Sequence, residues 1–298
     1  MSIKNYKLPP PSFNVSPKKD IGGPDGDTIK IEQPIRMVSC DTPEKEKPFG
    51  TAATAQPKLN TAKQRLLQNA FFPLIPKGLA KYLADKITPD AAKRHINAGK
   101  DASAQFEIIK NKALNKPNGK RRKVGVLPSG EVIDSHGRML AYIMTYFEKP
   151  LPAKDDPARK TYNLLMVENG WAVFFPIWPS LPKAPKDFDI IFSAAKKAWN
   201  TKKGMWNKYG SNLLLPYEYR LLIKLSIQYN SAKHKNQNNF VKVMMDNAFQ
   251  RLCVDLRTMK LVGKFDFYKV PPSHRFWIWE AEWKKNKAQI KSILGVKE

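Results

Sequence analysis

Hydrophobic and polar residues alternate with the two-residue period of strands near the start of the chain. Between residues 27 and 38, Ile29 and Ile31 alternate with charged side chains, and the pattern breaks at Pro34 before it resumes. Such alternation is typical of half-buried strands, and proline is tolerated only at their ends or edges. We therefore predict two short strands around a turn here, arranged as a β-hairpin or meander.

A helical region and a second strand region follow. Residues 51 to about 113 are rich in alanine, lysine, leucine and glutamine, and Pro73, Pro76 and Pro89 interrupt them. Because proline removes a helical hydrogen bond, several short helices are predicted instead of one long rod. Strand character returns over residues 115–144, and its turn signals predict a second β-meander.

The remaining pattern divides the chain into regions. Helical spacing recurs over 163–171 and 192–206, and a different block begins beyond residue 210, with a helical segment, an alternating segment and a lysine-rich helix. We predict a flexible, proline-rich arm at 1–20 and a main domain at 21–210 with a helical insertion at about 55–115. A C-terminal accessory region of no assigned fold, residues 211–298, completes the chain.

Charge changes this picture most. The 298 residues include 52 lysines and arginines against 26 acidic residues, a net charge of +26. A field of this sign draws polyanions, so DNA or RNA is the first predicted partner. An acidic membrane surface and a lysine-rich solvated shell are the alternatives, but clustering of the charge, as in KRRK at 120–123, favours a binding footprint. The hydrophobic share of 42% excludes wholesale disorder.

The sequence gives no membrane signal. No run approaches the ~18–20 apolar residues that a bilayer span requires, and the N-terminus lacks the apolar segment of a signal peptide. We therefore predict a cytoplasmic protein with no membrane partner, and infer no obligatory protein partner. Cys40 and Cys253 allow at most one disulfide, which is compatible with a reducing compartment.

Two segments carry the candidate chemistry, residues 25–44 and 134–143. They supply the carboxylates Asp27, Asp41 and Glu44 and the guanidinium groups of Arg36 and Arg138. Metal-assisted attack on a phosphodiester uses such a set. Hard oxygen ligands hold a divalent cation, a carboxylate activates water, and guanidinium groups neutralise charge on the phosphate.

Geometry constrains this set. Arg36 and Asp41 are five residues apart, so strict alternation would place them on opposite faces of one strand. The strand must therefore end or bulge between them. Taken alone, each motif also fits ordinary structure, because DGDT at 25–28 is typical of a turn and DTPE at 41–44 of a helix cap.

Taken together, the motifs resemble the staphylococcal nuclease (thermonuclease) family. The resemblance spans about residues 21–210 in the family's order, and it implies an α+β fold with an OB-type five-stranded β-barrel and packed helices. It also implies calcium-dependent hydrolysis of DNA, and of RNA as a possible substrate, to 3′-phosphate products. The matching text is DGDT at 25–28, Arg36 ahead of DTPE at 41–44, PFG and an alanine-rich start at 48–53, D-x-x-G-R-x-L-A-Y-I at 134–143, N-x-x-x-V-x-x-G-x-A at 163–172, and G-M-W at 204–206.

The resemblance also implies roles by position. The implied calcium ligands are Asp27, Asp41 and the backbone carbonyl of Thr42, the implied general base is Glu44, and the implied phosphate clamp is Arg36 with Arg138. The main alternative is a non-catalytic nucleic-acid-binding scaffold. Because a degenerate relative would lose a carboxylate or arginine first and this chain retains all of them, the enzyme is favoured.

Substrate recognition departs from the family. A Lys-Tyr pair is replaced by Ser135 and His136, and Pro176 and Trp178 stand where the family has tyrosines. Trp178 could stack on a base or simply pack; His136 could touch substrate or only form a turn. The candidate substrate-binding residues are Lys120, Arg121, Arg122, His136 and Trp178. The C-terminal region, with Arg220, Arg251, Arg257 and many lysines, is a candidate extension of the binding surface.

Overall fold

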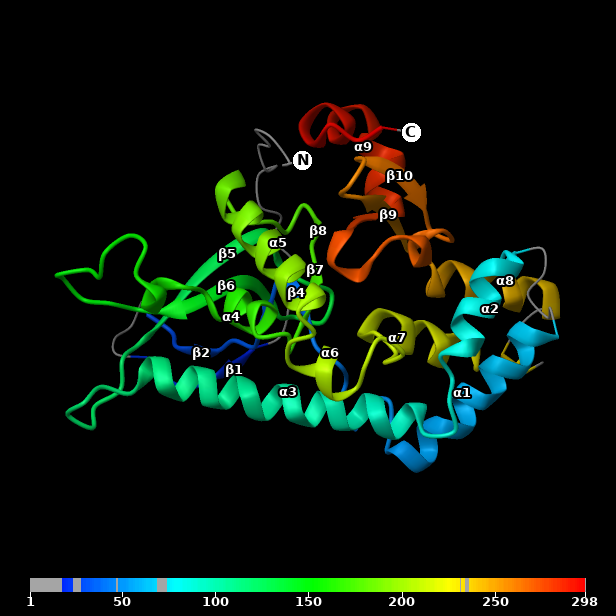
Figure 1. Ribbon diagram of the computed structural model, residues 1–298, viewed down its shortest axis with the longest axis horizontal. Helices are drawn as coiled ribbons and strands as arrows, with labels where there is room; N and C mark the ends of the chain where they lie inside the picture. The colour runs from blue at the N-terminus through cyan, green and yellow to red at the C-terminus, as the bar shows by residue number, and fades with distance from the viewer. Residues whose placement is uncertain are drawn as a thin grey trace.

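The computed structural model describes residues 18–23, 28–46, 48–68, 74–230, 232–233 and 236–297, arranged as in Figure 1. The elements are, in chain order, β1 (Lys19–Asp20), β2 (Ile31–Glu32), β3 (Ile35–Met37), β4 (Ser39–Asp41), α1 (Ala52–Leu67), α2 (Lys77–Asp85), α3 (Ala91–Leu114), β5 (Val124–Ile133), β6 (Met139–Thr145), α4 (Tyr162–Glu168), β7 (Val173–Phe175), β8 (Ile177–Trp178), α5 (Pro185–Asn200), α6 (Met205–Lys208), α7 (Pro216–Leu225), α8 (Gln237–Ala248), β9 (Arg251–Asp255), β10 (Lys260–Gly263), β11 (Arg275–Trp279) and α9 (Glu280–Leu294). Short 3-10 turns lie at Pro157–Arg159, Phe267–Lys269 and Pro272–His274.

The described strands form small separate sheets. Their orders are β1-β2, β3-β6-β5, β4-β7 and β10-β9-β11-β8. The mixed α+β composition is confirmed, as is the β5–β6 hairpin within the second strand region. The five-stranded barrel is not confirmed, because the strands of the described residues do not close into one barrel.

The backbone changes direction at Ser39, so that β3 and β4 belong to different sheets. Ser39 has a φ of 58°, a left-handed conformation uncommon outside glycine. On one side of the break β3 pairs parallel with β6, and on the other β4 pairs antiparallel with β7. The two strands predicted between 27 and 38 are present, but β2 pairs with β1 and β3 with β6, so the predicted pairing with each other is wrong. Residues 24–27 lie outside the described part of the chain.

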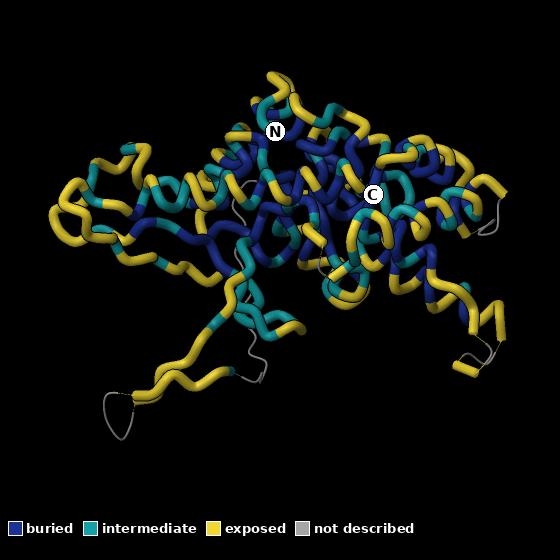
Figure 2. The backbone as a smooth tube through the Cα atoms, turned by 90° about the horizontal axis from the view of Figure 1, so that it is seen from below, coloured by how far each residue is buried: buried dark blue, intermediate teal, exposed yellow. Residues whose placement is uncertain are grey.

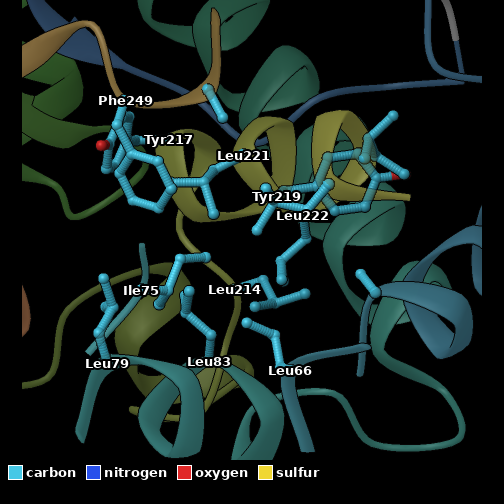
Figure 3. Close-up of a cluster of buried hydrophobic side chains, with 14 of the residues drawn as sticks. Leu66, Ile75, Leu79, Leu83, Leu214, Tyr217, Tyr219, Leu221, Leu222 and Phe249 are labelled. Carbon is cyan, nitrogen blue, oxygen red and sulfur yellow. The ribbon is translucent and has the colours of Figure 1, made fainter. Parts of the chain in front are cut away.

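The helical insertion folds against the C-terminal region. Apolar residues of α1 and α2, including Leu66, Leu79 and Leu83, are buried against Leu221 and Leu222 of α7 (Figure 3). The prediction of several separate helices is confirmed, but α3 spans 24 residues, so the prediction that they are all short is wrong for α3. Burial of such leucines contributes about 1.5–3 kcal/mol each relative to exposure, so this interface fixes where α7 lies.

A buried ionic network reinforces that interface. Glu218 of α7 accepts hydrogen bonds from Lys86 Nζ at 2.6 Å and Tyr82 Oη at 2.6 Å, and Arg275 of β11 lies 3.3 Å away. Burial raises the pKa of Glu218, but the opposing effect of Lys86 and Arg275 is larger and the pKa is lowered overall. The carboxylate therefore stays charged and ties α7 to α2 and β11.

The C-terminal strands also share a core with the middle of the chain. Phe188 of α5 packs 5.8 Å from Phe174 of β7 and 6.1 Å from Phe276 of β11 between ring centroids. Figure 2 shows buried segments running through the middle of the molecule and exposed segments at its edges. Among the described residues, no helix has the length and apolar character needed to cross a bilayer.

Candidate functional site

The break between β3 and β4 brings two of the predicted site residues together. Arg36 lies on β3 and Asp41 ends β4, and Arg36 Nη2 is 2.5 Å from Asp41 Oδ1. The positive φ of Ser39 redirects the chain, so that side chains five residues apart meet instead of pointing to opposite faces. The predicted interruption between these residues is confirmed.

A second arginine of this centre comes from the C-terminal region. Arg220 of α7 places Nη2 2.5 Å from Asp41 Oδ2 and Nη1 2.6 Å from Glu44 Oε1. Asp41 is thus held between two guanidinium groups with its side chain 1% exposed, while the Arg220 and Glu44 side chains remain 22% and 21% exposed. The sequence placed Arg220 only in a general basic surface; no local motif marks it as a partner of these acids.

The charges of this centre are strongly coupled. Burial raises the pKa of the Asp41 carboxyl, but Arg220 and Arg36 outweigh burial and lower the pKa to about 2. Burial lowers the pKa of Arg220, and its bonds with Asp41 and Glu44 reverse this, so the pKa is raised overall. The carboxylate and both guanidinium groups are therefore charged at neutral pH.

Helix α3 positions Glu44 through its backbone. The Glu44 amide donates to His95 Nε2 at 2.9 Å, and the other ring nitrogen lies 2.9 Å from the carbonyl of Leu214. Burial lowers the pKa of His95 to about 3, so the ring is neutral, with Nδ1 donating to Leu214 and Nε2 accepting from Glu44. The ring stacks on Tyr219 at 3.9 Å. No sequence motif marks His95 as part of the site.

Gly99 allows α3 to lie directly against the same loop. A Cβ at this position would lie 2.4 Å from the carbonyl oxygen of Glu44 and 2.6 Å from that of Pro43. Both contacts are with backbone, which cannot move aside as a flexible side chain would. The close approach therefore requires glycine.

We expect Gly99→Ala to destabilise the protein by about 1–3 kcal/mol because it overpacks this contact. Inside a helix without such a contact, the same change stabilises by roughly 0.5–1 kcal/mol, so the sign is diagnostic. Urea unfolding measures the difference, with Ser103→Ala on α3 as the control that should be neutral or slightly stabilising. A stabilised Gly99→Ala variant would contradict the close approach.

Arg138 pairs with Asp134 and, within the described part of the chain, makes no ion pair with Asp41 or Glu44. Its Nε and Nη2 donate to Asp134 Oδ2 at 2.9 and 2.7 Å, within the turn that leads into β6. Arg138 is two residues before Leu140, which is in register with Arg36 on β3. Because side chains alternate along a strand, Arg36 and Arg138 are expected on the same face of this sheet.

The implied calcium ligands are only partly described. Asp27 lies outside the described residues, and within the described ranges no group of three or more His, Cys, Asp or Glu side chains could hold a metal ion. Calcium takes about 6–8 oxygen ligands. Both oxygens of Asp41 face guanidinium groups, so Asp41 as arranged here does not fit a calcium ion unless Arg220 releases it.

Most of the predicted substrate-binding residues lie apart from this centre. The turn with Lys120, Arg121 and Arg122 follows the end of α3 at Leu114, roughly 22 Å along the helix axis from Gly99 at about 1.5 Å per residue. Arg121 and Arg122 there bond to Asn111, Ala113 and Asn115. The structure therefore does not bring this basic turn to Glu44.

The other two substrate-binding predictions have different outcomes. His136 is exposed in the turn before Arg138, and its amide donates to Asp134 at 2.9 Å. Trp178 is only 3% exposed and packs in the core with Leu181 and Phe188, so it offers no face for a base. The prediction that it binds substrate is corrected in favour of packing, because its strand β8 is covered by neighbouring core residues.

Part of the chain is similar to known proteins. Residues 109–208 match the family model described as staphylococcal nuclease homologue. The chain is also 27% identical over 132 residues to endonuclease YhcR of Bacillus subtilis (strain 168), an alignment that covers 44% of this chain and 9% of that protein. The chain thus spans a small part of this relative's length. The family match includes Arg138 but none of Arg36, Asp41, Glu44 and Arg220.

Proposed function

Because the chain carries a domain of the staphylococcal nuclease family, we propose that it is a phosphodiesterase that cleaves DNA, with RNA as a second substrate. The observation that supports this most is the meeting of Arg36, Asp41 and Glu44 at one partly exposed centre. A carboxylate next to guanidinium groups is the combination that water attack on a phosphodiester requires.

In the proposed reaction Glu44 takes the proton of the attacking water. Its side chain is 21% exposed, so water can reach it, and its amide bond to His95 fixes the backbone that carries it. Arg36 uses only Nη2 on Asp41, which leaves donors for a phosphate oxygen. Arg36 and Arg138 would then stabilise the charge that develops as water adds in line with the departing 5′ oxygen, which takes a proton from solvent, giving a 3′-phosphate end and a 5′-hydroxyl end.

Calcium is the cofactor that the family resemblance predicts. Asp27, Asp41 and the carbonyl of Thr42 are the proposed ligands, and the cation would supply charge neutralisation at the phosphate. Arg220 is bound to Asp41 in the described arrangement, and the roles of Glu44, Arg36 and Arg138 given above do not depend on the ion.

The test is incubation of the purified chain with plasmid and single-stranded DNA, first with calcium and then with excess chelator. We expect cleavage to 3′-phosphate ends with calcium and none with chelator. Cleavage that persists in chelator would remove the calcium requirement and keep the nuclease. Binding of DNA without cleavage under either condition would instead favour the non-catalytic scaffold.

Arg138→Lys is expected to reduce kcat/KM for DNA cleavage by about 100-fold, or ~2.7 kcal/mol. A lysine keeps the charge, but it cannot form the two-pronged contact that a guanidinium makes with phosphate oxygens. The matched control is Arg257→Lys, since Arg257 also pairs with a nearby carboxylate, Asp255, but lies in the turn between β9 and β10. If Arg138→Lys cleaves as fast as the control, Arg138 is not part of the clamp.

A further inference from the structure

One guanidinium near the proposed centre has no acidic partner among the described residues. Arg251, the first residue of β9, lies over the ring of Trp279 at 4.1 Å and near the rings of Phe175 and Tyr217 at 5.6 and 5.9 Å. Within the described part of the chain, its buried Nε has no hydrogen-bond partner. Arg251 is half-buried, and a charged group that is partly removed from water is normally paired, so an anion is the partner that this arrangement favours.

Helix α7, which carries one of these rings, also places two cations, Arg220 and Lys224, near Arg251. Tyr217, which it contacts, is one helical turn before Arg220 on α7, and Lys224 follows Arg220 by another turn. Lys224 donates to the neutral carbonyl of Asn247 at 2.7 Å. Tyr217, Arg220 and Lys224 thus lie on one face of α7, with Arg220 at Glu44 and Tyr217 at Arg251.

The electrostatic consequences are consistent with this closeness. Burial lowers the pKa of Arg251 to about 10; Tyr217 and Asp41 oppose this effect, and Arg220 and Arg36 add to it. Burial also lowers the pKa of Lys224, and Arg251 and Arg220 contribute. Arg251 therefore lies within electrostatic range of Arg220, Arg36 and Lys224 as well as of Asp41.

We propose that Arg251, assisted by Lys224, is a second phosphate-binding site that the C-terminal region adds beside the nuclease centre. A backbone phosphate of the bound nucleic acid supplies the missing anion. The aromatic rings hold the guanidinium plane in place, so little side-chain entropy is lost when the phosphate binds. This inference rests on the nucleic acid substrate of the proposed function, and it does not require cleavage.

The test measures binding of a short single-stranded DNA by fluorescence anisotropy, with chelator present, between about 50 and 200 mM salt. We expect Arg251→Gln to weaken binding about tenfold and to lower the slope of log K against log salt by about 0.7, the value for one phosphate contact on a single strand. Lys224→Gln should act in the same direction. Lys81→Gln, which removes an exposed cation of α2 that pairs with Asp85, should leave the slope unchanged.

Arg251→Lys separates charge from packing. It keeps the cation and should retain the salt slope, whereas a purely structural arginine would be disturbed equally by lysine and glutamine. An unchanged affinity and slope in folded Arg251→Gln would overturn the proposal, and if that variant does not fold, an unchanged slope in Lys224→Gln would do so. A wild-type chain that binds DNA through Arg251 but never cleaves it would disprove the proposed function and leave this site standing.

Discussion

Replacing Glu44 with glutamine is expected to lower kcat for DNA cleavage by about 1,000-fold, or ~4 kcal/mol. Glutamine has the same shape and can still accept a hydrogen bond from Arg220, which lies 2.6 Å from Glu44 in the wild type. It cannot take a proton from water. The loss should therefore appear in kcat, while KM changes little because the guanidinium groups that bind phosphate are untouched.

Glu46→Gln is the matched control. Glu46 is exposed and lies two residues further along the same loop. Its carboxylate is 2.7 Å from Lys100 Nζ and is not paired with Arg36 or Arg220 in the described residues. Its replacement removes the same charge from the loop and should leave kcat within about twofold of the wild type. A Glu44→Gln variant that retains a tenth or more of the wild-type kcat would exclude Glu44 as the base.

The centre was predictable where it depends on local sequence. Arg36, Asp41 and Glu44 lie in one short segment, and the parity of their spacing already required a break in the strand, which the structure places at Ser39. Arg220 is 176 residues from Glu44, and nothing in a helical pattern states which carboxylate a surface arginine will meet. His95 and Gly99 were missed for the same reason, since each acts on the Glu44 loop from a distant helix.

The helices and sheets also divide into features that local sequence predicts and features that depend on contacts between distant segments. Apolar periodicity correctly predicted the helices of the insertion, because a buried stripe is visible without knowledge of what covers it. It did not reveal that α1 and α2 pack on α7, since any apolar surface would satisfy that stripe. Strand pairing failed similarly, because the partners β6 and β7 are remote in sequence from β3 and β4.

These long-range contacts give the insertion and the C-terminal region a common role. The insertion supplies α2, which packs on α7, and α3, which supports the Glu44 loop; the C-terminal region supplies α7 itself. Arg220 reaches Asp41 only if α7 is held in this position. The proposed division at residue 210 therefore separates segments that build one centre.

The position of α7 depends on the buried ion pairs of Glu218. Glu218→Ala is expected to reduce the free energy of unfolding by about 3–5 kcal/mol. The change leaves Lys86 and Arg275 charged and buried, with side chains 9% and 4% exposed, and without their carboxylate. It also frees the amide of Leu215, which donates to Glu218 at 3.1 Å. Urea unfolding followed by tryptophan fluorescence measures the loss.

Asp85→Ala provides the contrast, because Asp85 also pairs with a lysine of α2 but does so in solvent, with its side chain 59% exposed. Surface ion pairs contribute only about 0–1 kcal/mol, so this variant should unfold almost as the wild type does. A Glu218→Ala variant that unfolds within 1 kcal/mol of Asp85→Ala would show that the buried network does not hold α7. In that case the position of Arg220 would rest on apolar packing against α1 and α2 alone.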